Sequence, residues 1–79
     1  MTWTLYILEC ADGSFYTGIS NDLDKRIKAH NAGLGAKYTR GRGPVRLLAS
    51  KLFESRSEAS IAESLVKKLA KNDKLGFFK

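Results

Sequence analysis

The sequence predicts a small α/β (α+β) domain in which a three-stranded antiparallel sheet is flanked by helices. Aromatic and β-branched residues are concentrated in residues 3–10 and 15–20, a composition typical of strands, and alternating apolar residues predict a third strand over residues 45–53. Residues 22–31 and the segment from 57 to about 71 instead carry apolar side chains at helical spacing, next to polar residues that can cap a helix. Strands and helices in this order predict a sheet with helices packed against it.

Length and composition limit the class of protein. The chain has 79 residues, too few for two independent cores, so we expect residues 1–79 to form a single domain. With 43% hydrophobic and 28% charged residues the composition is globular, and no apolar run is long enough to span a membrane. The first residues lack the features of a secretory signal, so we expect a cytoplasmic protein. One cysteine and one histidine exclude an internal disulfide and a structural zinc site.

The first two predicted strands form a hairpin, and its register decides which side chains share a face. A two-residue turn would scatter the apolar residues over both faces. A three-residue loop at residues 11–13, with Gly13 in the left-handed conformation, instead pairs Tyr6 with Gly18. Tyr6 and Tyr16 then become diagonal neighbours on one face, and Gly18 leaves space opposite Tyr6. The other face collects the predicted core: Trp3, Leu5, Ile7, Phe15, Thr17 and Ile19.

The remaining elements are predicted from caps and apolar spacing. We expect Asn21 or Ser20 to cap the first helix and Ser57 to cap the second. Helical spacing predicts the buried stripe of the second helix: Ile61, Leu65 and Leu69, with Ala62 and Val66 beside them. Alternation along the third strand predicts one set of side chains on a single face: Val45, Leu47, Ala49 and Phe53.

The net charge of +6 is concentrated in two groups. Half of the 14 basic residues lie between positions 25 and 46, where no acidic residue occurs. A second group lies near the C-terminus: Lys67, Lys68, Lys71, Lys74 and Lys79. Such clusters are the electrostatic footprint of a protein that binds a phosphate backbone, and solvated lysines that maintain solubility are the alternative.

Residues 33–44 are rich in glycine and are predicted to form a loop or a short broken helix that a ligand can approach closely. Four side chains of this segment are candidates for contact with nucleic acid: Lys37, Tyr38, Arg40 and Arg42. Tyr38 could stack on a base or sugar beside the two nearest cations, or it could simply anchor the loop.

Several positions of the chain together resemble the GIY-YIG nuclease superfamily. Residues 4–6 (Thr-Leu-Tyr) stand where the family has Gly-Ile-Tyr, and residues 16–18 (Tyr-Thr-Gly) stand where it has Tyr-Ile-Gly. The first triplet keeps only its tyrosine, whereas the second keeps its tyrosine and glycine. The next helix resembles the family's helix, with Arg26 and His30 four residues apart, and Glu63 stands where the family places its metal-binding glutamate. The resemblance covers nearly the whole chain and implies the fold of a short, stand-alone member.

The resemblance implies a catalytic set made of Tyr6, Tyr16, Arg26, His30 and Glu63. In this interpretation Arg26 binds the scissile phosphate, and Glu63 holds one Mg²⁺ or Mn²⁺ as a metal cofactor. A tyrosine takes the proton of the attacking water, and the residues leave open which tyrosine is the base. His30 is a hydrogen-bonding or relay partner to a tyrosine or to the phosphate. Each residue also has a simpler interpretation: a surface arginine, a histidine at a helix C-terminus, and a glutamate paired with the lysine four positions later.

The function predicted from these patterns is metal-dependent hydrolysis of phosphodiester bonds in DNA, with RNA left open as a substrate. A nucleic-acid-binding module on the same scaffold, with little or no cleavage, is the alternative. A small ribosome-associated or adaptor protein is a third class, which rests only on size and charge. Neither a membrane nor an obligate protein partner is inferred.

Overall fold

The computed structural model describes residues 2–35, 39 and 41–78, and in this part the chain forms a three-stranded antiparallel sheet with helices packed against it. The elements follow in this order: β1 (Trp3–Glu9), β2 (Phe15–Ser20), α1 (Leu23–Asn31), β3 (Arg46–Phe53), α2 (Arg56–Lys67), α3 (Lys71–Lys74) and a 3₁₀ turn (Leu75–Phe78). Strand β1 is central, and β2 and β3 are the two edges of the sheet. The predicted fold class is therefore confirmed.

The hairpin of β1 and β2 has the predicted register. Tyr6 lies opposite Gly18, and Gly13 in the loop has a φ of +84°, the left-handed conformation that favours glycine. The N–H of Cys10 donates to the carbonyl of Ser14 over 2.8 Å, which closes the predicted three-residue loop at residues 11–13. Tyr6 and Tyr16 therefore lie on the same face of the sheet.

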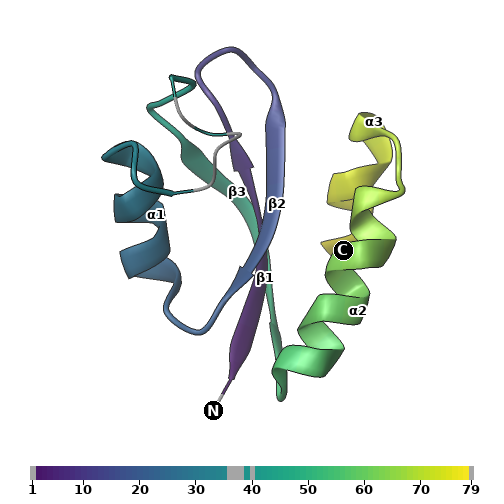
Figure 1. Cartoon of the computed structure of the whole chain (residues 1–79). Coiled ribbons are helices and arrows are strands. Elements are labelled where there is room, and N and C mark those ends of the chain that lie inside the picture. The colour runs from purple at the N-terminus through teal and green to yellow at the C-terminus, as the bar shows by residue number, and fades with distance from the viewer. Residues whose placement is uncertain (1, 36–38, 40, 79) are drawn as a thin grey trace.

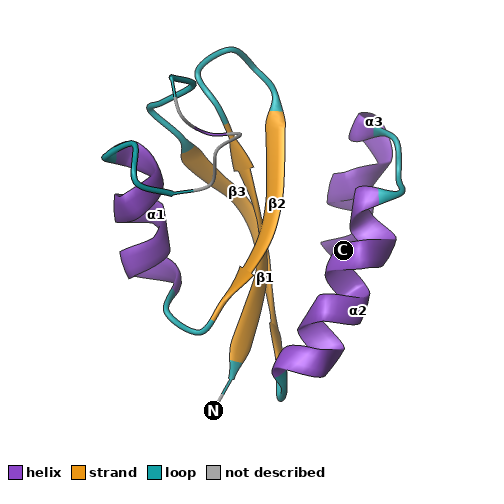
Figure 2. Cartoon of the chain, in the orientation of Figure 1, coloured by secondary structure: helices purple, strands orange, loops and turns teal. Residues whose placement is uncertain are grey.

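Helices cover both faces of the sheet (Figure 1). Helix α1 lies against one face, and α2 with α3 lies against the other, so strands form the middle of three layers (Figure 2). The face under α2 holds one buried cluster: Leu5, Ile7, Ala62 and Val66. Partly buried side chains pack around it: Phe15, Ile19, Leu48, Phe53, Leu75, Phe77 and Phe78.

The tyrosine face is also part of the core, which the sequence pattern did not predict. A second buried cluster consists of Tyr6, Leu8, Cys10 and Val45, with Tyr16, Leu23 and Ile27 packed against it. Tyr6 has no exposed surface. The two tyrosines proposed for chemistry are thus held by apolar packing from β1, β3 and α1.

The predicted face of β3 is wrong because the strand contains an irregularity. Ala49 pairs with Ile7, but Leu47 pairs with Leu8, so one extra residue lies between the two pairs. Such a bulge shifts the alternation of the strand by one residue. Val45 and Leu47 consequently share the tyrosine face, whereas Ala49 and Phe53 lie on the α2 face.

The predicted buried stripe of α2 is wrong for three of its five residues. Ala62 and Val66 are buried as expected, and Ala59 is buried with them. The three larger residues are exposed instead: Ile61 to 63%, Leu65 to 52% and Leu69 to 37%. The helix packs against the sheet through its smaller side chains, which allow a closer approach, and this rotates the larger apolar side chains toward solvent.

The caps also differ from the predicted ones. Asp22 caps α1 by accepting the N–H of Lys25 at 3.2 Å, in place of Asn21 or Ser20. Ser55, two residues before the predicted Ser57, caps α2 by accepting the N–H of Glu58 at 3.1 Å. A serine followed three positions later by glutamate matches a capping box.

Helix α2 ends at Lys67 instead of continuing to about residue 71. The chain turns after Lys68 and forms α3 and the 3₁₀ turn, whose apolar side chains pack against the core under α2. Lys74 Nζ donates to the carbonyl of Val66 at 2.9 Å, and this carbonyl also accepts the N–H of Leu69 at 3.0 Å, so two donors meet it at the helix end. A longer helix would carry these apolar residues away from the sheet. Among the described residues, each helix is too short or too polar to cross a lipid bilayer.

Candidate active site

The phenol of Tyr6 lies across the edge strand, directly over Gly18. A Cβ atom at Gly18 would stand 2.7 Å from Tyr6 Oη, 2.9 Å from Tyr6 Cζ and 3.0 Å from Tyr16 Cε2. The two distances to Tyr6 are shorter than real Cβ contacts and the one to Tyr16 is unusually tight, so a side chain at position 18 and the Tyr6 ring exclude each other. The missing side chain of Gly18 is what allows the hydroxyl of a central-strand tyrosine to reach the free edge of β2.

His30 joins Tyr6 to the loop that follows α1. Its Nε2 atom is hydrogen-bonded to Tyr6 Oη at 3.3 Å, and its Nδ1 atom to Thr39 Oγ1 at 2.8 Å. Only 1% of His30 and 1% of Thr39 is exposed. Gly35 supports this arrangement, because a Cβ there would lie 2.3 Å from His30 Nδ1. The imidazole is therefore fixed on both nitrogens and packed by a glycine.

Burial determines the protonation states of His30 and Tyr6. Loss of solvent lowers the pKa of His30 below its usual 6.5, and the nearby charge of Arg26 lowers it further. His30 is therefore neutral at pH 7 and offers one ring nitrogen as an acceptor. Burial also raises the pKa of Tyr6 above its usual 10, and a hydrogen bond from the Arg26 side chain opposes this only in part. Tyr6 is a neutral phenol at pH 7.

Tyr16 completes a cluster of three rings. Its ring centroid lies 6.4 Å from that of Tyr6 and 5.1 Å from that of His30, while the centroids of Tyr6 and His30 are 6.3 Å apart. Unlike Tyr6, Tyr16 is only half-buried, and it lines a surface cavity beside β2. The structure thus brings together the two tyrosines and the histidine that the sequence singled out.

Arg26 lies one turn before His30 on α1, and its side chain is exposed apart from its hydrogen bond to the Tyr6 hydroxyl. It also lines a cavity of about 230 Å³ at the start of α1, together with Lys25. An exposed guanidinium that bonds a buried hydroxyl can exchange this partner for a phosphate.

Glu63 approaches this cluster from α2, on the other side of the sheet. Its side chain is 21% exposed and pairs with Lys67 at 3.4 Å. This ion pair is the simpler role that the sequence spacing also predicted for Glu63. Its charge nevertheless reaches the phenol, since it is one of the causes that raise the pKa of Tyr6. Its ion-pair partner Lys67 lines the cavity beside β2, so Glu63 lies near this edge rather than on a remote surface.

The donors at this edge fit a metal ion only in part. Within the described residues there is no group of three or more His, Cys, Asp or Glu side chains that could hold a metal. Mg²⁺ is nevertheless often bound by one or two carboxylates, with water and substrate phosphates supplying the other ligands. Glu63 offers one such carboxylate, so the residues fit an ion that binds together with substrate.

The loop residues predicted to contact nucleic acid are described only in part. Lys37, Tyr38 and Arg40 lie outside the described residues. Arg42 is half-buried, and its Nη1 atom donates to Asp12 Oδ2 at 2.5 Å, which ties the loop to the tip of the hairpin. The site residues remain predictions, although the structure brings the rings of Tyr6, Tyr16 and His30 together.

Two residues of the site were missed by the sequence analysis. Thr39 and Gly35 hold His30 from a loop whose glycines suggested only a close approach to a ligand. No pattern could have identified Thr39, because its contact depends on the path of the loop. Gly35 carried a weak signal, since a glycine outside any turn often marks close packing.

Comparison with known proteins identifies the family. The GIY-YIG catalytic domain family matches residues 2–75. The UPF0213 protein CPE1444 of Clostridium perfringens is 59% identical over 71 residues, which cover 90% of this chain and 76% of that protein. The chain is also similar to the solution NMR structure of the UPF0213 protein BH0048 from Bacillus halodurans. That match has a TM-score of 0.60 and 54% identity, and it covers 96% of this chain and 81% of the other.

A second solved structure agrees with this assignment. The solution NMR structure of the protein EF2693 from E. faecalis matches with a TM-score of 0.64 and 42% identity, over 95% of this chain and 81% of that one. The resemblance noticed in the two tyrosine triplets is therefore confirmed over nearly the whole chain. The chain belongs to the GIY-YIG catalytic domain family, a family of nuclease domains.

Proposed function

We propose that this protein is a metal-dependent endonuclease that hydrolyses phosphodiester bonds in DNA. The observation that carries the proposal is the buried hydrogen bond between Tyr6 and His30 beside Arg26. It connects a hydroxyl to a neutral base next to a cation that can bind phosphate, and these are the groups that hydrolysis of a phosphodiester requires.

In the proposed reaction, water attacks phosphorus while the Tyr6 oxygen accepts a proton from the water. The phenol proton passes at the same time to Nε2 of His30, whose Nδ1–H donates to Thr39 Oγ1. This relay avoids a free phenolate, which the raised pKa of Tyr6 disfavours. The bond from phosphorus to the leaving oxygen breaks, and that oxygen takes a proton from solvent.

Arg26 has two roles in this mechanism. In the free protein it bonds the Tyr6 hydroxyl, which has no exposed surface. A phosphate that binds Arg26 draws the guanidinium away from the phenol, and the attacking water takes its place. Arg26 then stabilises the negative charge that develops on the phosphate oxygens.

The remaining members of the set position the substrate. Tyr16 is half-buried and lies beside the ring of His30, so it is suited to orient the water or the phosphate. Glu63 would hold Mg²⁺ or Mn²⁺, and the metal would add positive charge at the phosphate during attack.

Cleavage of DNA by matched variants tests this proposal. Plasmid, single-stranded and branched DNA, and an RNA of the same sequence, are incubated with Mg²⁺ or Mn²⁺. We expect wild-type cleavage to fall about 10²- to 10⁴-fold in Tyr6→Phe, which removes a relay group and keeps the ring. Glu63→Gln and Arg26→Gln should be inactive, whereas Glu54→Gln, which changes an exposed carboxylate elsewhere, should cleave like wild type.

The outcomes distinguish the candidate functions. Equal cleavage by wild type and Glu63→Gln would refute the metal role assigned to this residue. Full activity in Tyr6→Phe with loss in Tyr16→Phe would exchange the roles of the two tyrosines. Salt-sensitive DNA binding that survives every substitution without cleavage would favour the nucleic-acid-binding module.

A further inference from the structure

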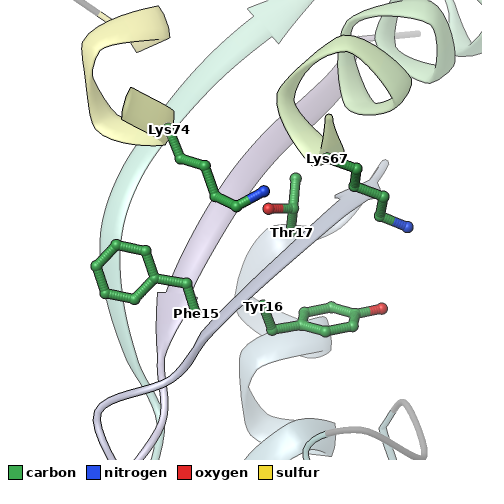
Figure 3. A pocket seen from close by; sticks show the side chains of 5 residues that line it. All are labelled: Phe15, Tyr16, Thr17, Lys67 and Lys74. Atoms are coloured by element: carbon green, nitrogen blue, oxygen red, sulfur yellow. The ribbon is translucent and has the colours of Figure 1, made fainter. Parts of the chain in front are cut away.

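Two cavities lie next to each other along the free edge of β2. The first has a volume of about 340 Å³ and is lined by Phe15, Tyr16, Thr17, Lys67 and Lys74 (Figure 3). The second has a volume of about 370 Å³ and is lined by residues 12–15 of the hairpin with Lys71 and Lys74. Because both share Phe15 and Lys74 as walls, we treat them as one edge groove, which runs from Tyr16 to the tip of the hairpin.

The position of the edge groove follows from the pleat of β2. Phe15 and Thr17 point toward the α2 face, while Tyr16 points toward the α1 face. A cavity lined by all three must therefore lie at the strand edge, where both faces are reached. Since Tyr16 also contacts the rings of Tyr6 and His30, one end of the groove meets the candidate active site.

Three lysines form the outer wall of the edge groove, and two of them are held in place. Lys71 Nζ donates to the carbonyl of Gly13 at 2.6 Å and lies 4.7 Å from the centre of the Phe15 ring. Lys74 Nζ donates to the carbonyl of Val66. An ammonium group has three N–H donors, so bonding one carbonyl still leaves donors for a phosphate oxygen. These ammonium groups are positioned before any ligand arrives.

Two acidic groups at the ends of the edge groove are paired with cations. Asp12 at the hairpin tip accepts from Arg42, and Glu63 at the other end pairs with Lys67. The described lining thus has a net positive charge along its length. The groove also contains part of the C-terminal lysine group, to which the proposed reaction gives no role.

We propose that the edge groove binds the backbone of an unpaired nucleic-acid strand that leads away from the scissile phosphate toward the hairpin tip. The inference rests on the proposed nuclease function, because it takes Tyr16 as the point where the strand enters. A duplex keeps its bases stacked inside and would touch only the lysines on the rim. An unpaired strand can place a base against Phe15 or Tyr16 while its phosphates meet the lysines, the combination that serves single-strand binding elsewhere.

Removal of two groove charges gives the sharpest test. The double variant Lys71→Gln/Lys74→Gln is compared with Lys51→Gln/Lys68→Gln, which removes the same charge from residues that do not line either cavity. Binding of a fluorescent single-stranded oligonucleotide is followed by anisotropy over a range of salt concentrations, with chelator present to prevent cleavage. Each lost phosphate contact on a single strand lowers the salt slope by about 0.7, so the groove variant should lose about 1.4 in slope and roughly 25-fold in affinity at 0.1 M salt.

The alternatives give different results. Equal losses in the groove variant and its control would overturn the proposal, because charge alone would then explain binding. Binding of a duplex as tight as that of the single strand would overturn the preference for an unpaired strand. Wild type that cleaves DNA, together with a groove variant that binds like wild type, would refute the groove and leave the nuclease function standing. Failure of wild type both to bind and to cleave would remove the two proposals together.

NMR provides a second measurement that does not depend on affinity alone. On titration with the oligonucleotide, the amides of Gly13, Phe15, Lys71 and Lys74 should shift in a saturable manner. The spectrum of the groove variant without ligand tells whether it is folded. Saturable shifts confined to α1 and β3 would place the strand elsewhere and contradict the proposal.

Discussion

The space above Gly18 is the part of the site most open to a quantitative test. A methyl group there would stand 2.7 Å from Tyr6 Oη, about 0.7 Å closer than the 3.4 Å at which ordinary contact begins. Tyr6 is fully buried, and β2 is held to β1 by backbone pairing, so neither partner has free space to move into. Overpacking of this kind costs about 1–3 kcal/mol. We expect Gly18→Ala to lower the free energy of unfolding by that amount.

The same displacement should disconnect the proposed relay. The hydrogen bond from Tyr6 to His30 is already 3.3 Å long, so a shift of several tenths of an ångström is enough to break it. Urea unfolding followed by circular dichroism measures the stability loss. The ¹⁵N chemical shifts of the His30 ring report the hydrogen bond, and DNA cleavage reports the function.

Gly13→Ala is the matched control. Gly13 has a φ of +84° and no heavy atom within 4 Å of its Cβ position, so alanine there costs about 1–2 kcal/mol through backbone strain alone. Both variants should lose stability, but only Gly18→Ala should change the spectrum of the His30 ring. A stable Gly18→Ala protein with an unchanged His30 spectrum would refute the steric argument, as would an equal effect of Gly13→Ala on His30.

Three further predictions concern the support of His30. Gly35→Ala would place Cβ 2.3 Å from His30 Nδ1 and 2.9 Å from His30 Cα, so its melting temperature should fall well below that of Gly76→Ala, where nothing lies within 4 Å. Thr39→Val removes the hydroxyl that bonds Nδ1 and should cost about 1–3 kcal/mol in urea unfolding, whereas Thr39→Ser should keep most of the stability. Folding lowers the pKa of His30, so the unfolded chain binds its proton more strongly and stability should fall as the pH drops below 6.5, by at most about 1.4 kcal/mol per pH unit. The free energy of unfolding, measured from pH 7 to pH 5, should not show this slope in the His30→Gln variant. An unchanged slope in that variant would show that another group titrates.

The hairpin could be predicted because two independent constraints agreed. Only one register both placed Gly13 in a left-handed position and sorted the apolar residues onto one face. The same register then predicted that Gly18 leaves room for Tyr6, and the structure has the ring at that position. The turn conformation and the distribution of apolar residues indicated the same pairing, so this part of the site could be predicted from the sequence.

The prediction of the buried stripe of helix α2 failed for a different reason. Its apolar residues form two adjacent stripes, and hydrophobicity ranks the stripe with Ile61 and Leu65 above the one with Ala59 and Ala62. The choice between them is made by the distance between helix and sheet, which a single sequence does not contain. The bulge in β3 could not be predicted either. Its extra residue follows from the pairing of β3 with β1, which the composition of the strand does not indicate.

The position of Glu63 connects these two results. With Ala59, Ala62 and Val66 against the sheet, Glu63 stands at the border of the buried face, and its partner Lys67 lines the cavity beside β2. Gly18 lets the Tyr6 hydroxyl reach the same edge from the opposite face. Two groups that belong to opposite sides of a sheet can meet only at an edge strand, and only where that strand lacks a side chain. The small residues of α2 and the glycine of β2 therefore contribute to one geometric requirement: they bring a carboxylate and a phenol to the same edge of the sheet.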